Sequence, residues 1–250
     1  MATKLYHSKD ILLAIRKAGV LPKVRDNKKV EYFNYPFAFD IETTSFTVQS
    51  NGQEKKQACM YIWTLAIGEI IVQGRTWSEF VTCCEEMAKF YNTSNTRRLV
   101  IYVHNLSFEF QFIHKWFKWL EVFALKKRQP VRALTTLGIE FRCSYKLSGY
   151  SLAKLGDQLT EHDVKKLSGD LDYSKKRNSK TPLTEQENAY CINDVLVVTA
   201  YIDEYIKRVG GINLIPMTKT GEVRNFTRNY CFTVGVRSTR SQIHLQNIVS

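Results

Sequence analysis

The sequence lacks the features that mark secreted and membrane proteins. Its six cysteines form no Cys-x-x-Cys pair, and most lie in segments with strand or helix patterns, which indicates free thiols. No apolar run is long enough to cross a bilayer, and the N-terminus lacks the apolar core of a signal peptide. We therefore expect a cytoplasmic protein, in the host cytoplasm if the chain is viral, with no membrane partner.

Acidic residues are also scarce relative to basic ones. Lys and Arg number 36 against 24 Asp and Glu, which gives a formal net charge of +12. The basic residues are scattered, so they predict a basic face and not a disordered arm. Such a surplus favours polyanionic partners, with nucleic acid ahead of an anionic membrane.

Repeats and low-complexity blocks are absent as well. The 250 residues are 44% hydrophobic and 12% aromatic, values typical of a folded globular protein. A chain of this length can bury a large core as one domain, with or without appendages.

The most informative stretch is residues 37–44, where an apolar run leads into Asp40 and Glu42. Side chains alternate along a strand, so these two carboxylates should project from one face at the end of a buried strand. Two neighbouring carboxylates are costly to bury unless a positive charge lies between them, and a divalent cation is the usual solution. The plain alternative is a strand that ends in two solvated acids.

The order of strand and helix patterns predicts an α/β fold with helices packed on a sheet. Alternating β-branched and aromatic residues predict strands at 37–42, 58–67, 70–73, 98–103, 131–135 and 139–144. Helices are expected at 9–17, 76–91, 107–120, 152–159 and 184–209. The polar stretches 47–57 and 165–181 are expected to be loops, the first with a turn at Asn51-Gly52.

Three helix starts carry capping signals. Ser8 can cap the first helix, and Thr76 with Glu79 has the form of a capping box. Thr184 and Glu187 form a second capping box at the start of the longest helix.

Two further segments place acids at element ends. Residues 104–109, His-Asn-Leu-Ser-Phe-Glu, follow a predicted strand and begin a helix, which brings in Glu109. Tyr190 and Asp194 are four residues apart in the longest helix, so they share one of its faces. Four carboxylates and one phenol on separate elements could therefore meet at one point. Core packing remains the alternative for Tyr190.

These segments resemble, in order, the three exonuclease motifs of the family B DNA polymerases: Asp-Ile-Glu-Thr, Asn-Leu-x-Phe-acid and Tyr-x-x-x-Asp. The His-Asn-Leu-x-Phe form and residues 168–173 resemble the protein-primed, phage-type branch. The resemblance covers roughly residues 36–210. It implies a ribonuclease-H-like mixed β-sheet flanked by helices. It also implies a proofreading 3′–5′ exonuclease that hydrolyses phosphodiesters at single-stranded DNA 3′ ends.

The same resemblance implies a two-metal site. Two Mg²⁺ or Mn²⁺ ions would be held by Asp40, Glu42, Glu109 and Asp194, and Tyr190 would orient the attacking water. A histidine subclass would need His where this chain has Ala189, so the tyrosine subclass fits. Glu109 departs from the family, which usually has Asp there. The extra methylene leaves open a slowed or inactive enzyme.

Further residues match positions that hold the DNA 3′ end in the family: Thr43, His104, Asn105 and Phe108. A buried first-turn residue is the alternative for Phe108, and a hydrogen-bonded structural histidine for His104. The protein-primed branch also uses a lysine at the position of Ser168. Lys165 or Lys166, slightly upstream, could substitute; a solvated loop charge is the alternative for each.

The polymerase motifs Asp-x-x-Ser-Leu-Tyr and Asp-Thr-Asp do not occur in these residues. We therefore expect residues 1–35 to form an N-terminal helix and linker, 36–215 an exonuclease domain, and 216–250 an extension toward a polymerase region. Partners would be a single-stranded DNA 3′ end and either a terminal priming protein or that polymerase region. A catalytically weakened binding module for DNA or the priming protein is the alternative function, and a ribonuclease is a third.

Overall fold

The computed structural model describes residues 4–50, 52–167 and 175–234. Ten strands occur in this part of the chain: β1 Lys4–His7, β2 Lys23–Arg25, β3 Glu31–Phe33, β4 Phe37–Ser50, β5 Gln53–Ile67, β6 Ile70–Gly74, β7 Arg97–Val103, β8 Trp119–Lys126, β9 Gln129–Thr135 and β10 Ile139–Cys143. The α-helices are α1 Ile11–Ala18, α2 Trp77–Tyr91, α3 Leu106–Ile113, α4 Ser144–Ser148, α5 Leu152–Asp157, α6 Glu185–Val209 and α7 Lys219–Val234.

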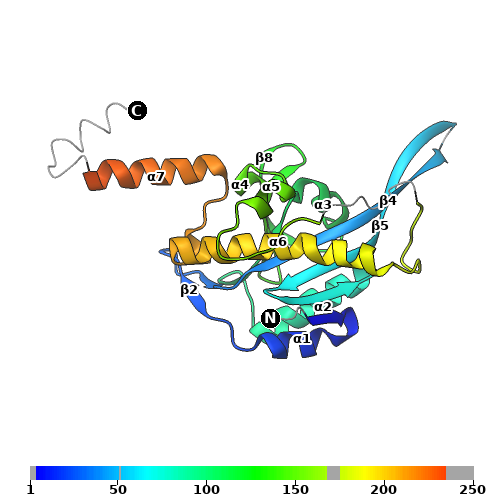
Figure 1. Cartoon of the computed structure of the whole chain (residues 1–250), viewed down its shortest axis with the longest axis horizontal. Coiled ribbons are helices and arrows are strands. Elements are labelled where there is room, and N and C mark those ends of the chain that lie inside the picture. The colour runs from blue at the N-terminus through cyan, green and yellow to red at the C-terminus, as the bar shows by residue number, and fades with distance from the viewer. Residues whose placement is uncertain (1–3, 51, 168–174, 235–250) are drawn as a thin grey trace.

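The strands form one mixed sheet in the order β1-β6-β5-β4-β7-β10-β9-β8, with β3 pairing β7 beside this path. Strands β4, β5 and β6 are an antiparallel meander, while β7 pairs parallel with both β4 and β10. Helices cover both faces (Figure 1). The predicted ribonuclease-H-like mixed sheet flanked by helices is therefore confirmed.

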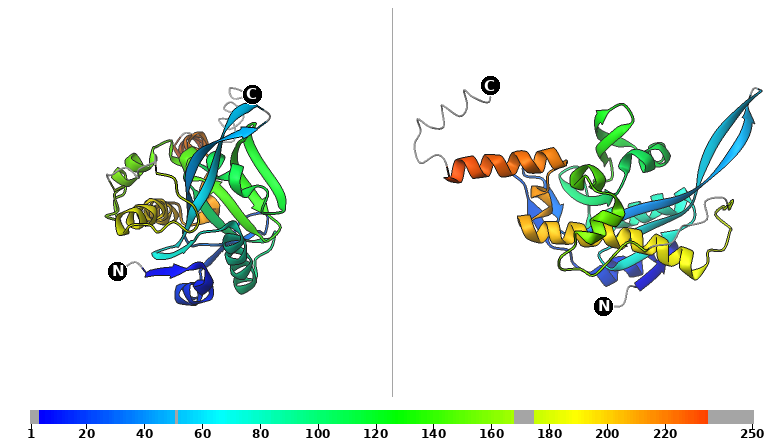
Figure 2. Two further views of the ribbon diagram at one scale, coloured as in Figure 1. Left: turned by 90° about the vertical axis from the view of Figure 1, so that its right-hand side faces the viewer. Right: turned by 45° about the horizontal axis from the view of Figure 1, so that its top comes forward.

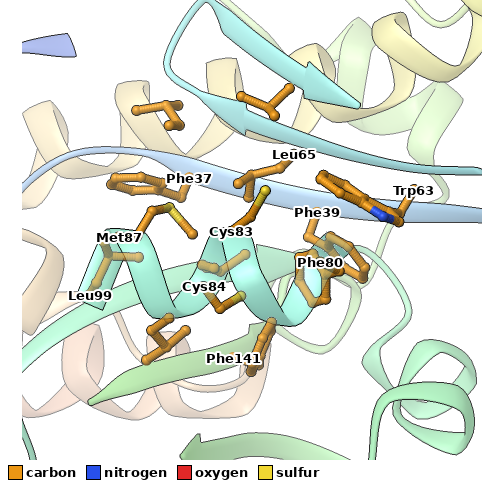
Figure 3. Packing of buried hydrophobic residues seen from close by; sticks show 14 of the residues in the cluster. Phe37, Phe39, Trp63, Leu65, Phe80, Cys83, Cys84, Met87, Leu99 and Phe141 are labelled. Atoms are coloured by element: carbon orange, nitrogen blue, oxygen red, sulfur yellow. The ribbon is translucent and has the colours of Figure 1, made fainter. Parts of the chain in front are cut away.

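Alternation along β4 assigns its residues to two different layers. Phe37, Phe39 and Ile41 belong to the core beneath α2, where Phe39 stacks on Phe80 with ring centroids 4.2 Å apart (Figure 3). Ala38 lies on the opposite face, in a cluster that includes Val195 of α6. The same alternation directs Asp40 and Glu42 toward α6.

Both predicted capping boxes are present. Thr76 and Glu79 close the first turn of α2 reciprocally, and Thr184 and Glu187 do the same for α6. The cap predicted for Ser8 is wrong. Its hydroxyl donates instead to Glu79 Oε1 at 2.7 Å, because a buried hydroxyl gains more from a carboxylate of another element than from its own helix start.

The loop predicted at 47–57 is also wrong. Strands β4 and β5 continue through it as a two-stranded ribbon that projects from the body of the molecule (Figures 1 and 2). The chain reverses where predicted, between Ser50 and Gln53, with Gly52 at φ 72°. Side chains on both faces of the ribbon are largely polar, so no apolar period reveals the strands. We call residues 43–50 and 53–60 the arm.

The helix predicted at 107–120 ends early. Helix α3 stops at Ile113, and Trp119–Lys126 form the edge strand β8, which pairs with β9. Apolar residues are almost continuous there, and such a run fits either period. The strands predicted at 58–67, 70–73, 98–103 and 131–135 lie within β5, β6, β7 and β9, and the one predicted at 139–144 is β10, which ends one residue earlier, at Cys143.

The remaining features concern cysteines and the tail. All six cysteines are unpaired, and Cys83, Cys84, Cys143 and Cys191 are buried. Helix α7 lies within the predicted extension 216–250, of which residues 235–250 are outside the described part. Within the described chain, none of the helices combines the length and apolar character needed to cross a bilayer.

Candidate metal centre

Three carboxylates predicted from two distant motifs come together. Asp40 and Glu42 lie on β4, and Asp194 lies on the second third of α6, which crosses this face of the sheet. Each offers an oxygen, and these oxygens all lie within 4.8 Å of one another. Glu42 and Asp194 are buried, with 8% and 7% of their surface exposed, whereas Asp40 is half-buried.

Burial raises the pKa of all three groups, and repulsion from neighbouring carboxylates adds to the effect on Asp40 and Glu42. Loss of solvation and then the charge of Asp194 raise the pKa of Asp40 to about 7. Loss of solvation followed by repulsion from Asp40 raises the pKa of Glu42 to about 8. Loss of solvation raises the pKa of Asp194 to about 6, against the opposing effect of Lys166. The cluster therefore carries more negative charge than its surroundings compensate.

Glu109 lies close to this cluster but not within it. Its side chain is buried in the first turn of α3, with 4% exposed. Loss of solvation and then repulsion from Asp40 raise the pKa of its carboxyl group well above the usual range. Its Oε2 atom is buried and has no hydrogen-bond partner among the residues that the structure describes.

Lys166 contacts both motif residues of α6, Tyr190 and Asp194. Its Nζ lies 3.6 Å from Asp194 Oδ2 and 5.1 Å from the centre of the Tyr190 ring. Tyr190 and Asp194 thus share the face of α6 that their spacing predicts. Of the two candidate lysines, Lys166 is half-buried at the cluster while Lys165 is exposed. Residues 168–173, including Ser168, lie outside the described residues.

A second cation at the site was not predicted. Arg177 belongs to the segment 165–181 that we expected to be exposed, yet only 4% of it is exposed. Its guanidinium pairs with Glu187, and its backbone N–H donates to Thr44 Oγ1 at 3.3 Å. Its charge lowers the pKa of Glu42, against the larger effect of burial. In a lysine-rich polar stretch, nothing in the sequence distinguishes Arg177 from the cations that stay exposed.

The candidate DNA-binding residues surround the start of α3. His104 hydrogen-bonds Ser144 Oγ through Nδ1 at 3.1 Å. Loss of solvation, followed by the charge of Lys166, lowers the pKa of His104 to about 4, so its ring is neutral near pH 7. Asn105 is the exposed N-cap residue of α3. The ring centroids of Phe108 and Phe112 are 5.2 Å apart. Phe108 is 37% exposed, so part of its ring is accessible.

Thr43 is placed differently from these residues. It is half-buried on β4 and pairs with Met60 across a register shift that follows Glu42. Alternation puts its side chain on the face opposite Asp40 and Glu42. The structure thus does not bring Thr43 onto the face of the acidic cluster.

The donor set fits a hard divalent cation. Carboxylate oxygens are the ligands that Mg²⁺ and Mn²⁺ prefer. Asp194 Oδ1 and Glu109 Oε2 are buried polar atoms with no hydrogen-bond partner in the described part of the chain. Such atoms are costly unless a cation or a polar group satisfies them. The cluster could therefore hold metal through Asp40, Glu42 and Asp194, with Glu109 nearby.

Comparisons with known proteins support the fold. No protein-family model matches the chain, and no curated protein matches it. Phi29 DNA polymerase complexed with primer–template DNA and incoming nucleotides is similar in structure: TM-score 0.59, 19% identity, covering 80% of this chain and 35% of that chain. Its complex with single-stranded DNA gives a TM-score of 0.60 at 19% identity, covering 79% of this chain and 35% of that one. The chain thus spans about a third of these polymerases' length, and the family resemblance of its motifs agrees with its fold.

Proposed function

We propose that this chain is a metal-dependent 3′–5′ exonuclease unit that acts on single-stranded DNA 3′ ends. The observation that carries the proposal is the convergence of Asp40, Glu42 and Asp194, three largely buried carboxylates from two elements within 4.8 Å. Three acids gathered at raised pKa destabilise a fold unless a ligand compensates their charge.

The acids have separate proposed roles. Asp40, Glu42 and Asp194 would hold the metal, and Glu109 would complete its surroundings from the start of α3. When bound, a pair of Mg²⁺ or Mn²⁺ ions supplies an activated water and charge stabilisation for the leaving 3′ oxygen. The N-terminus of α3 offsets part of the cost of a negative charge on the buried Glu109 carboxyl group.

Tyr190 and Lys166 would act on the reacting groups. The Tyr190 hydroxyl can hydrogen-bond the attacking water, and the face that it shares with Asp194 favours this role. Lys166 Nζ can balance the charge of the substrate phosphate, and its contacts with Tyr190 and Asp194 support this role. These contacts favour Lys166 over Lys165 as the assisting lysine.

The strand terminus would be held at the start of α3. The accessible part of the Phe108 ring can stack on a base, and Asn105 can hydrogen-bond sugar or phosphate. His104 is neutral, so it would act as a hydrogen-bonding group and not as a charge. A role for Thr43 would have to come from the opposite face of β4.

The wider context follows from the neighbours. The net charge of +12 suits a nucleic-acid substrate. Since phi29 DNA polymerase has been solved with primer–template and single-stranded DNA, we propose a proofreading role beside a protein-primed polymerase region. A terminal priming protein and that region are the proposed partners, residues 36–215 the proposed exonuclease domain, and the cytoplasm the proposed location.

A binding module of the same fold is the second candidate. Glu109 favours it, because a carboxylate one methylene longer than the family's Asp can misplace a ligand for Mg²⁺, which demands near-ideal geometry. In this function the basic surface would hold DNA or a priming protein without hydrolysis.

A labelled oligonucleotide separates the candidates. With Mg²⁺ or Mn²⁺, the chain should shorten a 5′-labelled single strand one nucleotide at a time, and Asp40→Ala should not. An unshortened strand that still binds, with binding unchanged by Asp40→Ala, would leave the binding module. Faster shortening of RNA than of DNA would point to the ribonuclease.

A further inference from the structure

The arm continues the strands that carry the acidic cluster. Residues 43–50 follow Glu42 directly along β4 and at roughly 3.3 Å per residue span about 25 Å, of which the outer part projects from the body. A two-stranded ribbon without a covering layer is marginally stable in isolation. Packing therefore does not account for an arm of this length, which favours a binding role.

A bulge decides which residues of the arm share the face of the cluster. Glu42 pairs with Ile62, but Thr43 pairs with Met60, so Tyr61 is an extra residue on β5. The extra residue reverses the alternation of β5 beyond that point. Directly paired residues share a face, and Val48 pairs with Lys55.

The two faces of the arm consequently differ in charge. Because β4 itself has no extra residue, Val48 shares the face of Asp40 and Glu42, and Lys55 joins it there. Lys56 lies on the reverse face with Glu54, the acid of the arm, which accepts a hydrogen bond from Gln49 Nε2 at 3.2 Å. The face continuous with the cluster thus carries a lysine that no arm acid opposes.

Other groups on that face suit a single strand of nucleic acid. Half-buried Phe46 and exposed Gln57 form a direct pair on the face of Lys55. At the base of the arm, Lys176 Nζ donates to the Ser45 carbonyl oxygen, and Lys175 beside it is exposed. Positive charges interleaved with an aromatic ring and amides are the features of single-strand binding surfaces.

We propose that this face of the arm is a track for the single strand that lies 5′ to the nucleotide in the metal centre. Lys55 would contact phosphate, and the segment at Lys175 and Lys176 would border the track near the body. The inference rests on the proposed function for its direction, since the strand must end at Asp40 and Glu42.

The matched pair Lys55→Glu and Lys56→Glu tests the track. Both changes reverse one exposed charge on neighbouring residues of one strand, but on opposite faces. Binding of fluorescein-labelled single strands of about 4 and about 16 nucleotides would be measured by anisotropy in EDTA, where no hydrolysis occurs. We expect Lys55→Glu to weaken binding of the long strand about tenfold and Lys56→Glu no more than about twofold.

The short strand provides the internal comparison, because it fills the metal centre without reaching Lys55. Neither variant should change its binding or, with Mg²⁺, its shortening. Lys55→Ala should also lower the salt dependence of long-strand affinity by about 0.7 in log–log slope. Equal losses in both Glu variants, or none in either, would overturn the track. If the wild-type chain shortens the short strand while the track fails, the proposed function stands alone; if nothing is shortened, that function fails independently.

Discussion

Strand β4 presents two faces that are both largely buried but contribute to folding with opposite sign. Phe37 and Phe39 pack beneath α2, and removing such rings from water stabilises the fold. One residue further on, Asp40 and Glu42 face α6, and burial raises the pKa of each by disfavouring its charge. Burial alone therefore does not separate a core residue from a candidate functional residue. A buried side chain becomes a functional candidate when nothing in the fold compensates the cost of burying it.

The largest expected effect is the loss of activity on substitution of an acid of this face. Asp40→Asn keeps the shape of the side chain but removes a carboxylate that we propose as a metal ligand. If that ligand supplies several kcal/mol of transition-state stabilisation, the rate of strand shortening should fall by about 10³. Single-turnover kinetics on a labelled strand would measure the loss. Fully retained activity would remove Asp40 from the site.

The same variant should also change the stability of the fold. Because the pKa of Asp40 is raised to about 7, the folded state keeps a proton that the unfolded chain loses near pH 4, so stability falls as pH rises between these values. Without metal at about pH 8, Asp40→Asn should therefore unfold at higher urea concentration than the wild type. Glu140→Gln is the control, since loss of its close Arg142 partner should destabilise.

Breaking the apolar face should do the reverse. Phe39→Ala removes a ring stacked on Phe80 and should cost about 3–5 kcal/mol in free energy of unfolding. Urea denaturation would measure it, with Phe39→Leu as the milder control. A cost below about 1 kcal/mol would contradict the packing described for this face.

A smaller effect separates the two lysines beside the acidic face. Lys166→Ala removes the cation 3.6 Å from Asp194 and should slow strand shortening about 10- to 100-fold, whereas Lys165→Ala should leave the rate within about twofold. Circular dichroism would establish that both variants are folded. Equal rates in the two variants would show that neither lysine has the proposed role.

The smallest expected effect is thermal. Protons compete with metal for groups whose pKa is about 6 to 8, so Mn²⁺ should raise the melting temperature more at about pH 8 than at about pH 6. The shift should be about 2–4 °C for each kcal/mol of binding. Scanning calorimetry would measure it, and an equal shift in Asp40→Asn would show that Mn²⁺ binds elsewhere.

Local rules predicted the fold where one face of an element is apolar. The strands around Phe39 and the helices opened by Thr76 and Thr184 follow directly from period and capping. The arm could not be predicted this way, because a ribbon with two polar faces has no period that differs from a loop. The position of β8 was missed for the opposite reason, since a nearly continuous apolar run has no period either.

The site was predictable in part for a related reason. Asp40, Glu42 and Asp194 lie at fixed positions on regular elements, so alternation and helical spacing direct them, and the three come together as those spacings suggested. Arg177 lies on an irregular segment whose path depends on tertiary contacts with Thr44 and Glu187. No spacing rule applies to such a residue.

The capping box of α6 has a consequence for the accuracy of the acidic cluster. Glu187 closes the first turn and also pairs with Arg177, which is tied to β4 through Thr44. The rotational phase of α6 is therefore fixed against the strand at the helix start. Each residue advances a helix by about 100°, so this anchoring determines the direction in which Tyr190 and Asp194 point. The capping box at the start of α6 thus fixes the orientation of site residues up to two turns further along the helix.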